Sequence, residues 1–143
     1  MLVEEVMNRD VKTIRPNDTV KNAAKIMNEN RIGSLVVVSG TGEVLGIITE
    51  RDILTDVVAA GRNAQEIKVE EIMSRDLITI TPDKTLEEAA NVMTEHKIKK
   101  LPVIQNNKLI GIITATDLIA HEEKLTEKVA KLLMISPLRK IGG

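Results

Sequence analysis

The stretch GIITERD at residues 46–52 returns as GIITATD at residues 111–117, and this repetition indicates a fold built from two similar halves. The earlier segment VEEVM at 3–7 likewise returns as VEEIM at 69–73, so a long segment occurs twice in the same order. Two copies are too few for a solenoid, which needs at least about three stacked units. We therefore expect the two repeats to pack face to face as one pseudo-symmetric domain, with any ligand sites occurring in pairs.

The composition limits the class of protein. The chain has 143 residues, of which 43% are hydrophobic and 29% charged, as in an ordinary globular domain. It contains no cysteine, which excludes disulfides, thiolate metal ligands and thiol nucleophiles. It contains no aromatic residue either, so the stacking platforms that single-stranded nucleic acids use are missing. A net charge of −1 gives no general attraction to nucleic acid or membrane. Because the sequence shows neither a membrane span nor a signal peptide, we expect a cytoplasmic protein.

Each repeat shows the same order of predicted elements. A short helical segment leads to an extended segment (11–14 and 77–80), which a proline ends. A helix with apolar residues at i, i+3, i+4 and i+7 follows, and Thr19 and Thr85 precede these helices as candidate N-caps. Two strands joined by a hairpin come next, and then a second helix. The predicted boundaries are 1–61 for the first repeat, 62–68 for a polar linker, 69–121 for the second repeat and 122–143 for a C-terminal helical extension and tail.

The strands, expected at 35–38, 44–48, 101–104 and 109–113, are almost all apolar and β-branched. We therefore expect both faces of each strand to be buried. The extension at 122–143 carries an apolar stripe without a counterpart in the first repeat. It could fold back on the core or pack on a partner subunit, and we favour the partner.

Signatures of catalysis are scarce. His96 and His121 lack metal-binding spacing and have no nucleophile partner, so each is interpreted as a surface histidine. The paired glutamates fall in helical stretches, where solvated faces or partners of the helix dipole are expected rather than an acid–base couple. Neither a phosphate-binding loop nor a dinucleotide motif occurs. We predict a non-catalytic protein without a metal site.

The repeated Gly-Ile-Ile-Thr-x-x-Asp segment is the strongest candidate site. It passes from a strand into a helix, so backbone N–H groups would point toward an anion. Gly46 and Gly111 would let a ligand approach the backbone. The threonines would offer hydroxyls, and Asp52 and Asp117 would accept hydrogen bonds from both hydroxyls of a ribose. The competing interpretation is a capping box, which needs no ligand.

The two repeats differ in charge before the strand that starts near Leu35 or Leu101. The second repeat reads HKIKKLP at 96–102, with three lysines, where the first reads NRIGSLV at 30–36. A charge run is usually a solvated loop. Here, however, it adjoins a strand expected to line the cleft between the repeats, where lysines would attract phosphates. Arg51 could do the same in the first repeat.

Together these residues resemble a tandem pair of cystathionine-β-synthase (CBS) domains, a Bateman module. The resemblance runs from Val3 to about Ile119. It rests on an ordered series of motifs: Met-x-x-Asp, Thr-Ile-x-Pro-x-x-Thr, the apolar-stripe helix, Leu-Pro-Val-Ile and Gly-Ile-Ile-Thr-x-x-Asp. Both repeats carry the series, except that Val36 stands where the second repeat has Pro102. The resemblance implies a mixed α/β (α+β) fold of two β-α-β-β-α repeats packed with pseudo-twofold symmetry.

The resemblance also implies which residues would hold a ligand. Asp52 and Asp117 would bind the ribose hydroxyls, the threonines and their following residues would lie near phosphates, and the first extended segment would border an adenine. The lysines before Leu101 correspond to basic phosphate contacts, which the first repeat lacks, so two unequal sites are expected. The implied ligand-binding residues are Thr13, Ile14, Gly46, Thr49, Arg51, Asp52, Ile78, Thr79, Lys99, Lys100, Pro102, Gly111, Thr114, Thr116 and Asp117.

The expected function is therefore that of a stand-alone regulatory module. It would sense an adenine nucleotide, AMP or ADP before ATP, form a homodimer and signal to an unknown protein effector. One alternative is a sensor of S-adenosylmethionine or a related adenosyl ligand. Another is a ligand-free dimerisation or interaction scaffold, in which the Thr-x-x-Asp segments are only caps. We place an enzyme or a nucleic-acid-binding protein well below these, and we expect no membrane partner.

Overall fold

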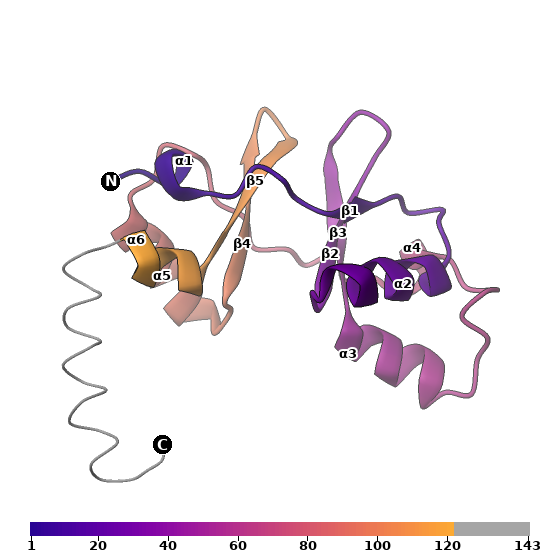
Figure 1. The fold of residues 1–143 in the computed structure, drawn as a ribbon. Coiled ribbons are helices and arrows are strands. Elements are labelled where there is room, and N and C mark those ends of the chain that lie inside the picture. Colours follow the sequence, from indigo (N-terminus) through magenta and orange to yellow (C-terminus); the bar gives the residue numbers. More distant parts are fainter. Residues whose placement is uncertain (122–143) are drawn as a thin grey trace, which may run out of the picture. The chain divides into compact units, whose positions relative to one another are not determined.

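A computed structural model describes residues 1–121 of the chain, as a mixed α+β structure with two small sheets (Figure 1). None of the described helices is long and apolar enough to cross a membrane. The elements follow in the order α1 (Val3–Val6), β1 (Thr13–Ile14), α2 (Val20–Asn30), β2 (Ser34–Val38), β3 (Val44–Thr49), α3 (Glu50–Ile53), η1 (Leu54–Val58), α4 (Val69–Ile72), α5 (Leu86–His96), β4 (Lys100–Gln105), β5 (Lys108–Thr114) and α6 (Ala115–His121).

The first sheet has the order β1-β2-β3. β1 runs parallel to β2, with Thr13 opposite Val36, and β3 runs antiparallel to β2, with Val36 opposite Ile47. A hairpin joins β2 to β3 through a glycine with φ of 89°, a left-handed conformation that glycine adopts without strain. The antiparallel hairpin predicted from sequence is therefore confirmed.

The second sheet contains β4 and β5. Asn106 and Asn107 connect them with φ of 54° and 66°. Two consecutive residues with positive φ are typical of the tight turn whose twist matches that of the flanking strands, and asparagine tolerates this conformation. The Asn-Asn hairpin signal in the sequence is confirmed here as well.

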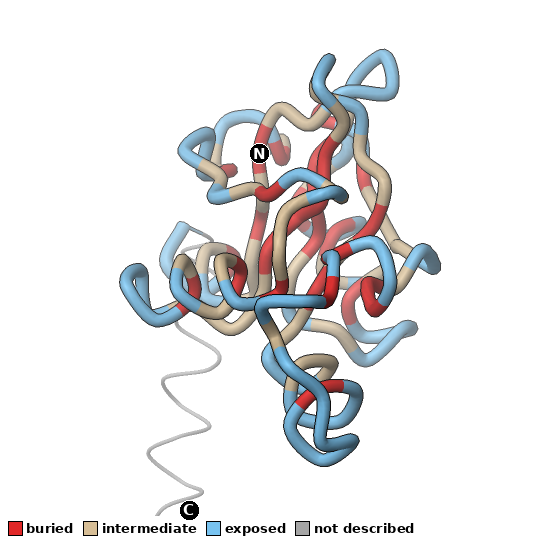
Figure 2. Tube along the Cα trace, turned by 90° about the vertical axis from the view of Figure 1, so that its right-hand side faces the viewer, coloured by how far each residue is buried: buried red, intermediate tan, exposed pale blue. Residues whose placement is uncertain are grey.

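The helices α2 and α5 begin at the predicted threonine caps. The Thr19 hydroxyl accepts a hydrogen bond from the Asn22 amide at 3.1 Å, and the Thr85 hydroxyl accepts one from the Glu88 amide at the same distance. Glu88 in turn accepts from the backbone N–H and the hydroxyl of Thr85, and these bonds lower the pKa of its carboxyl group. Three residues of each predicted apolar stripe are buried: Val20, Ala23 and Met27 in α2, and Leu86, Ala89 and Met93 in α5. Ala24 and Ala90, the fourth members, are half-buried. Figure 2 shows buried and exposed stretches alternating along the chain.

The paired glutamates act at helix starts. The Glu5 carboxylate accepts a hydrogen bond from the Leu2 amide at 2.6 Å, and the Glu71 carboxylate accepts one from the Lys68 amide at 2.7 Å. Both are first-turn acids, in the position where a carboxylate satisfies a free helix N–H and complements the helix dipole. For these two residues the prediction of dipole partners is confirmed.

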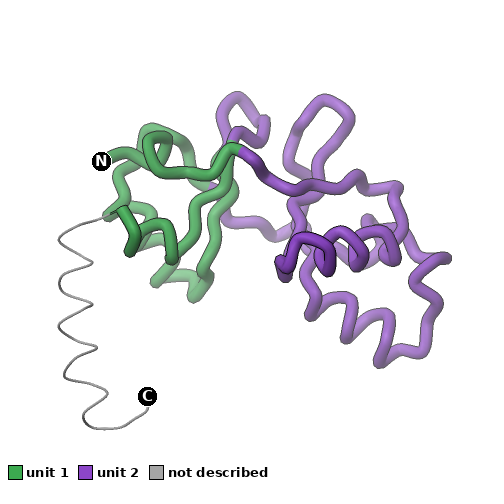
Figure 3. Tube along the Cα trace, in the orientation of Figure 1, with its two compact units in different colours: residues 1–9, 80–103, 111–143 green, residues 10–79, 104–110 purple. Residues whose placement is uncertain are grey.

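The described chain forms two compact units that exchange their leading segments (Figure 3). Within the described residues, unit 1 combines residues 1–9 with 80–103 and 111–121, and unit 2 combines residues 10–79 with 104–110. The start of the first repeat thus packs with the body of the second, and the start of the second packs with the body of the first. The compact units therefore do not follow the repeat boundaries drawn from the sequence.

Three local features add detail to the predictions, and one of them, the burial of β3 and β5, contradicts the prediction. The extended segment at 77–80 pairs in parallel at one residue, through an isolated bridge between Ile80 and Val103, where the first repeat has the short strand β1. β3 and β5 are not buried on both faces: only Gly46 and Ile48 of β3 are buried, and β5 alternates in the same way, because each of these strands covers the core with one face. The second helix of the first repeat is one α turn followed by the π-helical η1. The predicted extension at 122–143 lies outside the described residues.

Candidate functional site

Both Thr-x-x-Asp segments fold as capping boxes. The amide of Thr49 donates to Asp52 Oδ2 at 2.9 Å, and the Asp52 amide donates to Thr49 Oγ1 at 3.1 Å. In the second repeat, Thr114 and Asp117 make the same two bonds at the same two distances. The capping interpretation is therefore confirmed as local structure. It places each aspartate half-buried at a strand–helix junction, with one carboxylate oxygen engaged by the backbone.

The anion cradle expected at these helix starts is largely occupied by the protein itself. The Glu50 amide donates to the Gly33 carbonyl at 2.9 Å, and the Ala115 amide donates to the Lys99 carbonyl at 2.8 Å. When the capping bonds are included, one backbone amide at each helix start has no acceptor among the described residues. It is the Arg51 amide in the first repeat and the Thr116 amide in the second. Protein oxygens therefore already accept from most of these amides, and the binding of an anion at the helix starts stays a prediction.

The two glycines have a packing role. A Cβ on Gly46 would lie 2.4 Å from the Ser74 carbonyl oxygen, and one on Gly111 would lie 2.6 Å from Met7 Sδ. At each glycine a segment crosses the strand and pairs with the next residue: Ser74 exchanges both backbone bonds with Ile47, as Asn8 does with Ile112. The space expected for a ligand at these glycines is filled by the chain. A glycine inside a strand is the signal that could have indicated this close backbone approach.

The structure divides the expected ligand residues between the units. Unit 1 contains the second repeated segment, from Gly111 to Asp117, together with Lys99, Lys100 and Pro102. The Lys99 carbonyl accepts a hydrogen bond from the amide of Ala115, the first residue of α6. Unit 2 receives Thr13, Ile14, Gly46, Thr49, Arg51, Asp52, Ile78 and Thr79. Contacts across a cleft between the repeats, and hence the ligand roles of all these residues, stay a prediction.

The difference in charge predicted between the repeats has a local structural basis. In unit 2, the Glu50 side chain lies over Gly33, and a Cβ there would come within 2.9 Å of Glu50 Oε1. In unit 1, Lys99 stands at the position of Gly33 and Ala115 at the position of Glu50. The long charged side chain of unit 1 therefore precedes the strand instead of starting the helix, and it is positive instead of negative. Sequence reasoning noticed Lys99 but missed Glu50, which can be found only by comparing both members of each pair.

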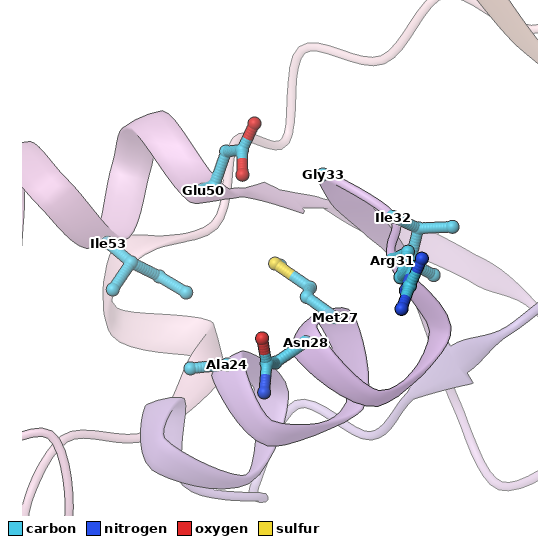
Figure 4. Close-up of a pocket in the computed structure, with 8 residues that line it drawn as sticks. All are labelled: Ala24, Met27, Asn28, Arg31, Ile32, Gly33, Glu50 and Ile53. Carbon is cyan, nitrogen blue, oxygen red and sulfur yellow. The ribbon is translucent and has the colours of Figure 1, made fainter.

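Two hollows lie within unit 2. The first, of about 400 Å³, separates the end of α2 from the start of α3, and the Met27 sulfur points into it between Glu50 and Asn28 (Figure 4). The second, of about 410 Å³, has a mixed lining, half apolar and half polar: Val44, Leu45, Leu77 and Ile104 with Glu43, Arg75, Thr79 and Asn107. Thr79 is the only expected ligand residue that lines either of these hollows, and neither contains Thr49 or Asp52.

Two α+β repeats, each with a Thr-x-x-Asp capping box, define the class of this protein as a paired-repeat module. The family model "CBS domain" matches residues 3–59 and 69–124, and the chain therefore belongs to the CBS-domain family. The resemblance inferred from the ordered motifs is confirmed.

Known relatives agree with this assignment. An uncharacterized protein of Methanopyrus kandleri is 41% identical over 89% of this chain, which spans 65% of that relative's length. The CBS domain-containing protein YhcV of Bacillus subtilis is 36% identical, with 84% of both chains covered. A putative signal-transduction protein with CBS domains from Burkholderia ambifaria has a solved structure with a TM-score of 0.74 and 35% identity, covering 86% of this chain and 97% of that one. The mixed α+β fold is shown by this structural match.

Proposed function

We propose that this chain is a non-catalytic regulatory module that binds an adenine nucleotide or a related adenosyl ligand and passes its occupancy to a protein partner. The observation that carries the proposal is the identical geometry of Asp52 and Asp117. Each accepts one backbone bond at 2.9 Å through Oδ2, and neither Oδ1 receives a bond from the described residues. A carboxylate offers about four acceptor positions, so capping leaves capacity for the two hydroxyls of a ribose.

The charge distribution supports unequal sites. Lys99 is exposed and adjoins the helix start that carries Thr114 and Asp117. A lysine is a flexible point charge that suits phosphate groups. In unit 2 the equivalent place holds Glu50, whose carboxylate repels phosphate, and Arg51 supplies the nearby positive charge. We expect the site containing Asp117 to prefer phosphorylated ligands, AMP or ADP before ATP, and the site containing Asp52 to suit a less charged adenosyl ligand such as S-adenosylmethionine.

Ligand binding would act by shifting the populations of two conformations of the module. A ligand changes the balance between two conformations only as far as it binds one of them more tightly. We expect the module to act as a homodimer and to signal to a separate effector protein, in the cytoplasm.

A second candidate function is a ligand-free scaffold. It is favoured by the same capping boxes, because Thr49 and Asp52 already have a complete structural role without a ligand. Under this hypothesis, changing the aspartate charge alters stability only and no adenosyl compound binds.

The test is calorimetry with AMP, ADP, ATP and S-adenosylmethionine on protein that has been unfolded and refolded to remove any retained ligand. Asp117→Asn keeps an amide oxygen for the Thr114 N–H but removes the carboxylate charge, so the cap persists. We expect this variant to lose affinity for AMP about tenfold with little change in stability, as for the loss of a charged hydrogen bond. Asp52→Asn is the matched variant, and it should leave the tighter site unchanged.

The absence of Trp, Tyr and Phe provides an independent readout. The protein hardly absorbs near 280 nm, so a purine that stays bound through desalting appears directly in the ultraviolet spectrum. If none of the four compounds binds and Asp117→Asn behaves like the parent protein in every assay, the sensor proposal fails and the scaffold remains.

A further inference from the structure

The hollow between α2 and α3 of unit 2 contains charged groups of both signs. Glu50 and Arg31 line it together with the amide side chain of Asn28, and all three residues are exposed. Figure 4 shows the Glu50 carboxylate and the Arg31 guanidinium on different sides of the Met27 side chain. Among residues 1–121, none of the three polar side chains takes part in an ion pair or a hydrogen bond. Two opposite charges thus line one hollow without pairing with each other.

The same hollow has an open apolar part. The Met27 sulfur points into the space, and Ala24 and Ile53 form part of its wall. Ile53 is only half-buried, whereas Leu118, at the equivalent position of the second repeat, is buried. Apolar walls with a few polar groups are typical of sites for small ligands, and a volume of about 400 Å³ lies within their usual range.

The second repeat does not reproduce these charges. Ala115 stands in place of Glu50, and Lys99 stands in place of Gly33. In unit 2 the glycine leaves the room that Glu50 uses, because a Cβ on Gly33 would lie 2.9 Å from Glu50 Oε1. A hollow lined by both signs of charge is therefore a property of the first repeat, and the capping geometry that the repeats share does not explain it.

The charges of the hollow indicate the chemistry of its ligand. One of the two charged side chains would repel a purely anionic ligand, and the other would repel a purely cationic one. A zwitterion is attracted by both. Thr49 and Asp52 do not line the hollow, so such a ligand would not occupy the adenosyl site proposed above. An α-amino acid combines an ammonium group, a carboxylate and, where its side chain is aliphatic, an apolar group.

We propose that this hollow binds a free α-amino acid with an aliphatic side chain. Its ammonium group donates to the Glu50 carboxylate, and its carboxylate accepts from the Arg31 guanidinium, whose planar fork suits a carboxylate. Its side chain lies on Met27 and Ile53 and covers the open apolar surface. A hydrogen bond of about 2.8 Å at each end lets the ligand join two charges that are too far apart for an ion pair. The inference goes beyond the adenosyl proposal and does not depend on it.

Methyl NMR tests where the ligand binds. Protein labelled with ¹³C at the methionine methyl groups gives one signal from Met27, in the hollow, and one from Met93, at the equivalent position of α5. On titration with L-leucine we expect the Met27 signal to shift until it saturates, while the Met93 signal stays in place. A Met27 signal that does not move up to the solubility limit of leucine overturns the proposal, as does an equal shift of both signals.

Two analogues of leucine test the two charges one at a time. L-Leucinamide lacks the carboxylate and N-acetyl-L-leucine lacks the ammonium group, while both keep the aliphatic side chain. Each should bind about tenfold more weakly than leucine, as for the loss of one hydrogen bond to a charged group. Equal binding of all three compounds would show that the charges of the hollow are not used, and would overturn the proposal.

Variants of the two charged residues should change these preferences selectively. Glu50→Gln should weaken the binding of leucine about tenfold and leave N-acetyl-L-leucine unaffected, because that analogue has no ammonium group. Arg31→Gln should weaken leucine to a similar extent and leave leucinamide unaffected, because leucinamide has no carboxylate. A variant that weakens all three compounds equally acts through the shape of the hollow, and this result overturns the charge pairing proposed for its residue.

Two control variants make the same changes of charge outside the hollow. Lys97→Gln removes a positive charge at the residue equivalent to Arg31, and both residues follow their helices with a positive φ, of 56° and 53°. Glu29→Gln removes a negative charge from an exposed position of α2 that does not line the hollow. Both controls should bind leucine as the parent protein does. Circular dichroism should show the parent secondary structure in all four variants.

The outcomes separate this inference from the adenosyl proposal. A Met27 signal that does not respond to leucine overturns the amino-acid site and leaves the binding of AMP, which calorimetry measures, unaffected. A chain that binds leucine with the expected selectivity but none of the adenosyl compounds supports the amino-acid site and contradicts the adenosyl proposal alone.

Discussion

The second repeat carries Lys99 and Ala115 where the first carries Gly33 and Glu50, although the backbone bond between each pair is the same. The Glu50 amide reaches the Gly33 carbonyl at 2.9 Å, and the Ala115 amide reaches the Lys99 carbonyl at 2.8 Å. The backbone is thus held constant while the charge above it changes sign. At these positions the two repeats thus differ in charge more than in backbone structure.

The largest expected effect concerns the framework. Gly46→Ala places a methyl group 2.4 Å from a backbone carbonyl oxygen, and Ser74 cannot withdraw without breaking its paired bonds to Ile47. At Gly111 the closest atom is the movable sulfur of Met7, with the Asn8 carbonyl oxygen at 3.1 Å. We expect Gly46→Ala to cost about 3 kcal/mol of unfolding free energy and Gly111→Ala about 1 kcal/mol, from the usual range for overpacking. Urea denaturation measures both.

Equal losses of unfolding free energy in Gly46→Ala and Gly111→Ala would contradict this interpretation of the contacts. Met7→Ala combined with Gly111→Ala supplies the control, because removing the sulfur should relieve most of the strain at Gly111. The long side chain of Met73 is farther from Gly46, at 3.2 Å, so Met73→Ala should give no such relief there.

The second prediction concerns charge. Lys99→Ala should weaken binding of AMP about tenfold and leave adenosine almost unaffected, because adenosine lacks the phosphate that the lysine would attract. Calorimetry with both ligands measures the difference. An equal loss for adenosine would mean that Lys99 supports the fold of the site instead of the phosphate.

The third prediction exchanges side chains between the repeats. Gly33→Lys with Glu50→Ala gives the first repeat the charges of the second, and removing Glu50 clears the space that a side chain at position 33 needs. This double variant should raise the affinity of the weaker site for AMP. Gly33→Lys alone should do less, because the Glu50 carboxylate stays in place.

The smallest effect concerns pH. Hydrogen bonds from the Thr85 backbone and hydroxyl lower the pKa of Glu88 below its ordinary value of 4.5, while the matching position in α2 is the uncharged Asn22. A carboxyl group whose pKa is lowered by folding stabilises the protein above its unfolded pKa, and this contribution disappears as the pH falls through the folded value. The stability difference between the parent protein and Glu88→Gln should therefore be constant near neutral pH and shrink below about pH 4.5.

Carboxyl titration by NMR checks the cause directly. Thr85→Ala removes the hydroxyl donor and should return the pKa of Glu88 toward its ordinary value. Thr19→Ala, the matched change in the first repeat, should leave that pKa where it is.

Most of the fold was predictable because its signals are local. The Thr19 and Thr85 caps, the apolar stripes and the Asn106–Asn107 turn each follow from a few neighbouring residues. The full burial of β3 and β5 was predicted wrongly, because apolar composition does not reveal which face of a strand meets the core. The π-helical turn at Leu54–Val58 has no composition signal that separates it from an ordinary helix.

The candidate site was predictable to a smaller extent. Thr-x-x-Asp gave the capping geometry, since both partners lie within one turn. The occupant of the space beside Gly46 was not predictable, because Ser74 reaches it from a distant part of the chain. The position of the Glu50 side chain over Gly33 was not predictable either, because the sequence does not show which side chain fills the space beside a glycine. Contacts between distant segments depend on tertiary packing, which a pattern within one repeat does not encode.

The exchange of leading segments between units has a consequence for synthesis at the ribosome. Ile47 pairs with Ser74, which follows soon after it, whereas Asn8 pairs with Ile112, which is synthesised much later than Asn8. Because domains fold during translation as their segments emerge, most of unit 2 can assemble while the segment around Asn8 still lacks its pairing strand. That segment is thus made before unit 2 but docks after it, when the body of unit 1 has emerged.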